Sequence, residues 1–267
     1  MSKESAMNHP VLWQFTASHY NEKARWALDW KGVAHVRQSL LPGPHALKIR
    51  RMTGQTAVPV LVLDGRAIHD STRIIEALEL AYPDPPLYPR EPAERRRALE
   101  LEEFFDVELG PHVRRLAFYF LLPHPGAVVA MFGQESGTAA RAAWRMAFPL
   151  LRAAMRKSLR IDREGAEVSR RKTLAALDRI ETELRPSGYL GDAFTVADLT
   201  AAALFSPLVA PPEFPYQLPQ RIPQAMSDFR ESLATRPAFL WVLEMYRRHR
   251  GPSAAVEDEV TGETEPQ

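Results

Sequence analysis

The 267-residue chain contains no cysteine. This absence excludes disulfides, thiolate-ligated zinc, iron–sulfur clusters and any mechanism with a protein thiol as nucleophile. An excess of charge of one sign is also missing, since 34 Lys and Arg residues balance 33 Asp and Glu residues and leave a formal net charge of +1. A nucleic-acid-binding protein usually carries a strong positive charge, so we expect no nucleic acid partner.

Long hydrophobic runs are missing as well. No segment approaches the roughly 18 continuous apolar residues of a membrane span, and residues 1–9 are polar. We therefore expect a cytoplasmic protein with no membrane partner. The hydrophobic share of 45% and the charged share of 25% are ordinary for globular proteins and fit one or two domains.

Proline residues divide the chain. The densest cluster, at positions 83, 85, 86, 89 and 92, forbids both a helix and a central strand, because proline fixes φ and lacks an amide donor. We predict a linker over residues 83–92, between one domain at 10–82 and a second at 93–250.

The region before this linker alternates strand-like and helical patterns. Apolar runs of strand length occupy 11–15, 33–40 and 58–63, and residues 21–31 carry good helix formers. Asp64-Gly65 separates two apolar runs and predicts a type I′ hairpin. A helical repeat follows and ends at Pro83. These elements predict a βαβ–ββα mixed sheet.

Beyond the linker nearly every pattern is helical. We predict helices over 94–122 with a kink at Gly110-Pro111, over 138–163, over 169–184, and over 222–249 with a break at Pro237. Thr195 and Asp198 are spaced as a capping box that begins a further helix. Residues 251–267 hold five acidic residues and no Lys or Arg, and they predict a disordered acidic tail.

Four short segments fall on these predicted elements in order: residues 15–28, residues 53–60, Asp70-Ser71-Thr72, and residues 191–198. Together they resemble the cytosolic glutathione transferase family, and residues 53–60 also resemble the glutaredoxin version of the thioredoxin fold. The resemblance implies a thioredoxin-like domain that binds glutathione, an all-helical second domain, glutathione as co-substrate and a homodimer.

Ser18 is the first candidate catalytic residue. The resemblance places it in the turn from the first strand into the first helix, where redox relatives have a cysteine-containing motif. A hydroxyl at a helix N-terminus stabilises a thiolate through the helix dipole and a charge-assisted hydrogen bond. Lowering a thiol pKa by about two units from its usual value of about 8.5 requires about 2.7 kcal/mol. Since the chain has no cysteine, thiolate stabilisation is favoured over thiol–disulfide exchange.

Other roles in this turn remain open. The Ser18 oxygen can instead cap the helix by accepting from a backbone amide, and the two roles are compatible. Tyr20 and Asn21 are the next candidates for thiolate contact, Tyr20 because a phenolic hydroxyl can donate in the same way. We expect His19 to be a solvated turn residue.

Five residues match glutathione contacts of the family. The resemblance implies a cis peptide bond at Val58-Pro59, where the backbone of Val58 pairs with the backbone of the glutathione cysteine. Asp70 and Ser71 match the pair that receives the γ-glutamyl end, with Ser71 suited to the carboxylate and Asp70 to the ammonium. A simple helix cap is the alternative for this pair. Gln55 resembles a residue that touches the glycyl or backbone part, although two extra residues follow it here.

The substrate pocket is less defined. A pocket for a small-molecule electrophile can draw on aromatic residues of the helical domain, although core packing is the alternative for each. Arginines spaced three, four and seven residues apart between 141 and 163 are interpreted as a solvated helix face, with an anionic partner as the alternative. We predict no metal site. The candidate pocket aromatics are Phe118, Tyr119, Trp144 and Phe205.

These observations predict a glutathione transferase that adds the glutathione thiolate to small apolar electrophiles. The first alternative is a protein of the same fold that binds glutathione or an apolar ligand without turnover. A structural or interaction protein on the same scaffold is the second.

Overall fold

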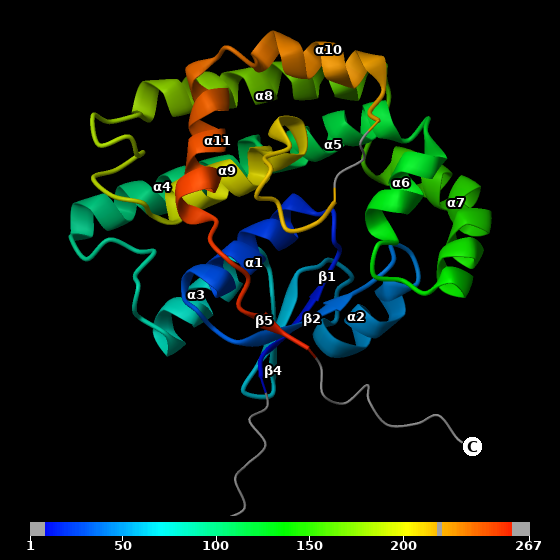
Figure 1. The fold of residues 1–267 in the computed structure, drawn as a ribbon, viewed down its shortest axis with the longest axis horizontal. Helices are drawn as coiled ribbons and strands as arrows, with labels where there is room; N and C mark the ends of the chain where they lie inside the picture. Colours follow the sequence, from blue (N-terminus) through cyan, green and yellow to red (C-terminus); the bar gives the residue numbers. More distant parts are fainter. Residues whose placement is uncertain (1–8, 218–220, 258–267) are drawn as a thin grey trace, which may run out of the picture.

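A computed structural model describes residues 9–217 and 221–257. A sheet with its helices occupies the lower half of Figure 1, and a layer of helices occupies the upper half. The predicted order, a mixed α/β domain of thioredoxin type followed by a helical domain, is confirmed.

Five strands form the sheet in the order β4-β3-β1-β2-β5. β2 is parallel to β1, as a βαβ unit requires, whereas β3 and β4 are antiparallel to their neighbours. Asp64 and Gly65 have φ values of 50° and 76°, and two positive φ values are typical of a type I′ turn, so the predicted hairpin is confirmed. The strands are β1 (Val11–Gln14), β2 (His35–Ser39), β3 (Val60–Leu63), β4 (Arg66–His69) and β5 (Ala255–Val256).

Three helices accompany the sheet. The predictions for α1 (His19–Trp30) and α3 (Ser71–Ala81) are confirmed, but α2 (His45–Thr53) was not predicted. Only Ile49 of α2 is buried, so its sequence lacks the apolar stripe from which a helix can be recognised.

The second domain is entirely helical within the described residues, and its two predicted interruptions are confirmed. A helix boundary lies at Leu109 before Gly110, and another lies before Pro237. The predicted helix over 138–163 ends earlier, at Ser158, and α6 was not predicted. No helix in the described ranges is long and apolar enough to cross a membrane. The helices are α4 (Pro92–Glu108), α5 (Gly110–Leu121), α6 (Pro125–Phe132), α7 (Thr138–Ser158), α8 (Arg163–Glu183), α9 (Val196–Val209), α10 (Gln224–Leu233) and α11 (Pro237–His249).

Helix α9 is the central element of the helical domain and is buried along nearly its whole length. It begins at the predicted capping box, in which the Asp198 carboxylate accepts from the Thr195 amide at 2.9 Å and the Thr195 hydroxyl accepts from the Ala197 amide at 3.3 Å. α9 packs against α1 of the first domain as well as α4 and α11. It therefore sets the position of the N-terminus of α1 relative to the second domain.

A buried ion cluster joins the domains on the other face of α1. The Lys23 ammonium lies 2.6 Å from the Asp106 carboxylate and 2.8 Å from that of Glu102, both on α4. It also donates to the Thr72 hydroxyl of α3 at 2.8 Å. Because the two carboxylates share one fully buried cation, α1, α3 and α4 are held together.

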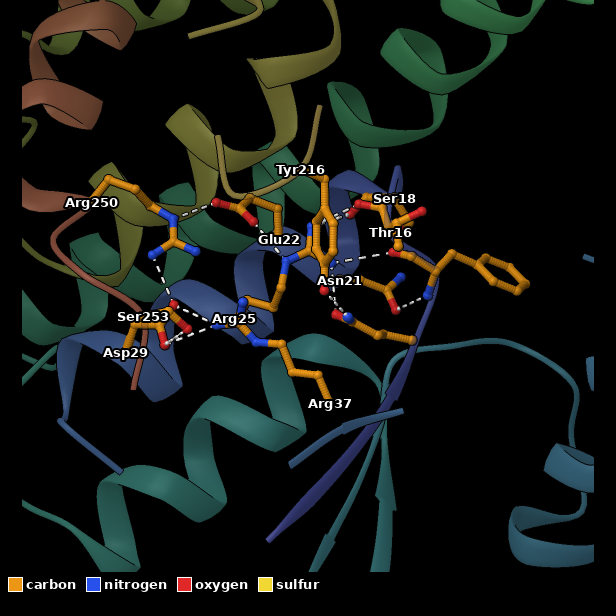
Figure 2. A network of polar contacts seen from close by, with 12 residues as sticks. Thr16, Ser18, Asn21, Glu22, Arg25, Asp29, Arg37, Tyr216, Arg250 and Ser253 are labelled. Atoms are coloured by element: carbon orange, nitrogen blue, oxygen red, sulfur yellow. Dashed lines mark hydrogen bonds and ion pairs between the residues drawn. The ribbon is translucent and has the colours of Figure 1, made fainter. Parts of the chain in front are cut away.

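The C-terminal segment returns to the first domain. After α11 the chain runs down from the helical layer to the sheet, where β5 pairs with β2 (Figure 1). Arg250 anchors this return by ion pairs of 2.6 Å to Glu22 and 2.8 Å to Asp29, and Ser253 reaches Asp29 as well (Figure 2). The prediction of a disordered tail from residue 251 is thus wrong for the residues that form β5, because an open sheet edge offers unpaired backbone groups. Residues 258–267 lie outside the described residues.

Candidate functional site

The turn between β1 and α1 presents Ser18. This residue is the N-cap of α1, with an extended backbone (φ −87°, ψ 127°), and its hydroxyl makes no capping hydrogen bond. The expected alternative, in which the Ser18 oxygen serves only as a cap, is therefore not what the structure contains. Within the described residues the hydroxyl has no partner and stays available to a ligand at a helix N-terminus.

Arg25, about two turns further along α1, holds this turn in place (Figure 2). Its guanidinium is fully buried and donates to the carbonyl oxygens of Phe15, Thr16 and Ser18 at 3.2–3.4 Å. Glu22 balances the charge, with its carboxylate 2.8 Å from the Arg25 Nε. One side chain thus fixes the backbone on both sides of the turn that carries Ser18.

Asn21 joins this turn to the loop before β3. Its side-chain oxygen accepts from the Phe15 amide at 3.1 Å, and its side-chain nitrogen donates to the Val58 carbonyl at 3.4 Å. The Val58-Pro59 bond is cis, as expected from the resemblance. Since both ends of the buried Asn21 amide are occupied, this residue positions the two loops, and the Val58 amide is left without a hydrogen bond in the described part of the chain.

The predicted glutathione residues share one polar cleft of about 770 Å³, lined by Gln55, Val58, Pro59, Asp70 and Ser71 among others. The structure therefore brings together residues that are up to 16 positions apart in the sequence.

Asp70 and Ser71 begin α3 at this cleft. The Asp70 carboxylate accepts from the amides of Thr72 and Arg73 at 3.0 and 3.3 Å, so the helix-cap role is real. Asp70 has φ 76° and ψ 129°, a backbone that non-glycine residues adopt only under strain. The Ser71 hydroxyl makes no hydrogen bond within the described residues.

The Gln55 side chain is tied to its own loop. It donates to the Thr53 hydroxyl at 2.9 Å and to the Ala57 carbonyl at 3.0 Å, and it accepts from the Ala57 amide. To contact a ligand, the Gln55 side chain must therefore break these hydrogen bonds to its own loop and form new ones to the ligand.

Tyr20 lines the same cleft, but its hydroxyl is already engaged. It donates to the Asp106 carbonyl at 2.7 Å, and a side chain on Gly110 would collide with it. Burial raises the pKa of this phenol well above its usual value. These contacts make Tyr20 an anchor between the domains and favour Ser18 for thiolate contact.

A second, apolar cavity of about 70 Å³ opens on the other side of the α1 N-terminus. Ala17 and His19 line it together with Phe118 and Phe132. Ala17 and Tyr20 thus contact different cavities, and Ser18 lies between them in the chain. The side chains near Ser18 separate a polar cleft from an apolar one.

Only one of the four aromatic residues predicted for the electrophile pocket, Phe118, lines this cavity. Tyr119 faces a different surface hollow. Trp144 donates from its indole to the Pro42 carbonyl at 2.7 Å, which fastens α7 to the first domain. Phe205 is fully buried in α9. Trp144 and Phe205 thus follow the core alternative, because helical spacing cannot distinguish a cavity wall from packed core, whereas Tyr119 is exposed and lies in neither the cavity nor the core.

Most of the arginines from 141 to 163 are exposed, as a solvated face requires. Arg152, Arg156 and Arg163 border the hollow that contains Tyr119. The described residues contain no group of three or more His, Asp or Glu side chains placed to hold a metal ion.

His19 is buried, contrary to the expected solvated turn residue. Its ring contacts the Gly110 carbonyl at 3.0 Å, and burial with nearby Arg114 lowers its pKa to about 3. His35 is buried at the start of β2, and burial lowers its pKa to about 4. Both rings are therefore neutral at physiological pH, and a pKa of about 3 makes His19 a poor general base.

These two histidines predict a loss of stability in mild acid. Because the folded pKa of each is below the usual 6.5, the unfolded chain takes up the protons first, and stability falls as pH drops from 6.5 toward the folded values. At about pH 5 each ring contributes roughly 2 kcal/mol less than at neutral pH. The difference in unfolding free energy between wild type and His19→Asn should narrow by that amount on acidification, as measured by urea denaturation. A constant difference for His19→Asn would contradict the prediction.

Two arginines of the site were not predicted from the sequence. Arg25 follows the turn within a pattern of ordinary helix formers. Arg114, on α5, lines both cavities. A single basic residue in a helix carries no signal of its role, because that role depends on which helices meet.

Residues 12–86 match the family model described as the N-terminal domain of glutathione S-transferase. The chain thus contains an N-terminal domain similar to that of glutathione S-transferases. It spans less than half of the curated relatives that it matches, 42% of one and 44% of another.

Three proteins are similar to this chain in sequence or in fold. The Caenorhabditis elegans protein named "Probable maleylacetoacetate isomerase" is 35% identical over 91 residues, which are 33% of this chain and 42% of the relative. The β-etherase LigF of Sphingobium sp. has a TM-score of 0.59 at 20% identity, over 88% of this chain and 98% of its own. A glutathione S-transferase from Methylobacillus flagellatus with glutathione bound has a TM-score of 0.57 at 16% identity, over 90% and 96% of the two chains. The glutathione transferase architecture thus extends over both domains.

Proposed function

We propose that this protein is a glutathione transferase that joins the glutathione thiolate to a small electrophile with an apolar body. The observation that carries the proposal is the Ser18 hydroxyl at the N-terminus of α1, which has no hydrogen-bond partner among the described residues. In the chain it is followed by His19, which lines the apolar cavity, and Tyr20, which lines the polar cleft. Arg25 and Asn21 fix this turn and the cis-proline loop beside it.

The polar cleft suits the rest of the tripeptide. The Val58 amide is free to pair with the backbone of the glutathione cysteine. At the opposite end, the N-terminus of α3 and the Ser71 hydroxyl suit the α-carboxylate of the γ-glutamyl group. Carboxylates of Asp70, Glu103 and Asp106 line the same cleft and suit the ammonium.

In the proposed reaction Ser18 donates a hydrogen bond to the thiolate and so keeps the sulfur ionised near neutral pH. The sulfur then attacks the electrophilic carbon, forms the C–S bond and expels the leaving group with its electron pair. Positioning and thiolate stabilisation supply the catalysis. The homodimer remains a prediction, and a partner subunit would border the same cleft.

Glutathione binding gives a direct test. Because a ligand that binds only the folded state stabilises it by mass action, millimolar glutathione should raise the melting temperature, by an amount that grows with concentration. Ser71→Ala should shrink the shift, whereas Ser158→Ala, at the distant end of α7, should retain it. An unchanged melting curve would overturn both the transferase and the glutathione-binding proposals. A shift without conjugation of chlorodinitrobenzene would leave the binding-protein alternative.

A second candidate reaction is a glutathione-dependent isomerisation, which the 35% identity to the isomerase-named relative favours. In that reaction the same thiolate adds to an activated double bond, the new single bond rotates, and elimination returns the thiolate. Turnover without net consumption of glutathione would identify it.

A further inference from the structure

Arg114 occupies the boundary between the two cavities of the site. Helix α5 places it on the wall of the polar cleft and on the wall of the apolar cavity. A substrate that lies in the polar cleft and extends an apolar group into the apolar cavity therefore passes Arg114.

The Arg114 guanidinium has no counter-charge. Among the described residues it forms no ion pair or hydrogen bond; its guanidinium carbon lies 5.9 Å from the centroid of the Tyr20 ring, and His19 is near it as well. The groups that act on it electrostatically are Tyr20 and Arg115, neither of which is a carboxylate. Glu103 and Asp106 line the same cleft but do not reach it.

Three other fully or partly buried arginines of this fold face carboxylates. Arg25 lies 2.8 Å from Glu22, Arg37 lies 2.7 Å from Asp29, and Arg250 contacts both carboxylates. Arg230, the other arginine of the apolar cavity, donates to the Val209 carbonyl at 2.8 Å and so caps the end of α9. Of these five arginines, only Arg114 forms no ion pair or hydrogen bond with the described residues.

A partly buried guanidinium without a partner is costly unless a ligand supplies the negative charge. Its planar fork of donors matches a carboxylate, which it binds through two parallel hydrogen bonds. We propose that Arg114 binds a carboxylate on the second substrate, so that this enzyme prefers small electrophiles with an anionic group beside an apolar body. This inference rests on the proposed transferase function and names the class of its electrophile.

A pair of electrophiles that differ only in charge tests the inference. Chlorodinitrobenzoate and its uncharged carboxamide undergo the same reaction, in which the thiolate displaces chloride from the ring. For Arg114→Met, kcat/KM with the benzoate should fall by on the order of tenfold to a hundredfold, which is the usual effect of losing a hydrogen bond to a charged group. With the carboxamide it should stay within about twofold. Arg145→Met, an exposed control on α7, should change neither value.

Binding of the finished conjugates gives a readout that does not require turnover. Calorimetry should show that wild type binds the glutathione conjugate of the benzoate more tightly than that of the carboxamide, and that Arg114→Met loses this preference. The variant should melt no lower than wild type, because it removes an unpaired charge, whereas a structural arginine would lower the melting temperature.

The outcomes separate the two proposals. If glutathione leaves the wild-type melting curve unchanged, the proposed function fails. If glutathione binds but wild type shows no preference for the anionic conjugate, the role of Arg114 alone is overturned. An equal loss with both electrophiles, together with a raised KM for glutathione, would assign Arg114 to a carboxylate of glutathione and overturn it as well.

Discussion

Ser18→Ala is expected to slow conjugation at neutral pH by on the order of tenfold to a hundredfold while glutathione binding stays nearly intact. The hydroxyl has no other partner in the described residues, so its removal breaks no protein hydrogen bond. The loss falls on the thiolate, whose pKa should rise by about one unit or more, each unit corresponding to about 1.4 kcal/mol. Ultraviolet titration of the bound thiolate measures this pKa directly.

Two neighbouring variants serve as controls for Ser18. Tyr20→Phe removes the bond to the Asp106 carbonyl and should cost about 1 kcal/mol of stability with little change in the thiolate pKa. Asn21→Ala releases the bond to the Val58 carbonyl and should weaken glutathione binding more than it shifts the pKa. If Ser18→Ala turns over normally and Tyr20→Phe does not, the thiolate contact belongs to Tyr20. If wild type shows no bound thiolate below about pH 8, catalysis through a stabilised thiolate is refuted.

Local sequence rules predicted the elements whose cause is local. The Asp64-Gly65 hairpin, the Thr195 capping box and the breaks before Gly110 and Pro237 each depend on residues within a few positions of one another. The candidate glutathione residues have a different source, namely the resemblance of the loop before β3 and the start of α3 to short segments of the glutathione transferase family.

The rest depends on packing that the sequence pattern does not record. α2 buries a single side chain, and β5 is a strand only because β2 offers an open edge. His19 has the surroundings of a turn in the sequence, yet α5 covers it. The arginines show this most clearly: Arg25 and Arg114 are alike in sequence, but Arg25 is fully paired, whereas Arg114 forms no ion pair or hydrogen bond in the part of the chain that the structure describes.

Arg25→Met is expected to destabilise the fold by about 3 kcal/mol, the lower end of the range for breaking a buried ion pair, because Arg250 still faces Glu22. It also removes one hydrogen bond from each of the carbonyl oxygens of Phe15, Thr16 and Ser18, of which Phe15 and Ser18 keep a backbone donor. The turn that presents Ser18 should therefore loosen. Arg25→Lys keeps the charge but not the fork of donors, so it should restore part of the stability and little of the turn geometry.

Arg37→Met is the matched control, since it removes one of two arginines from Asp29 as Arg25→Met removes one of two from Glu22. Arg37 does not touch the turn. Chemical denaturation should show that both variants lose stability, but only Arg25→Met should raise the pKa of bound glutathione and slow conjugation, by about tenfold or more. Equal chemical rates in the two variants would mean that Arg25 acts on folding alone. A shifted thiolate pKa in Arg25→Met only would show that this buried guanidinium positions Ser18.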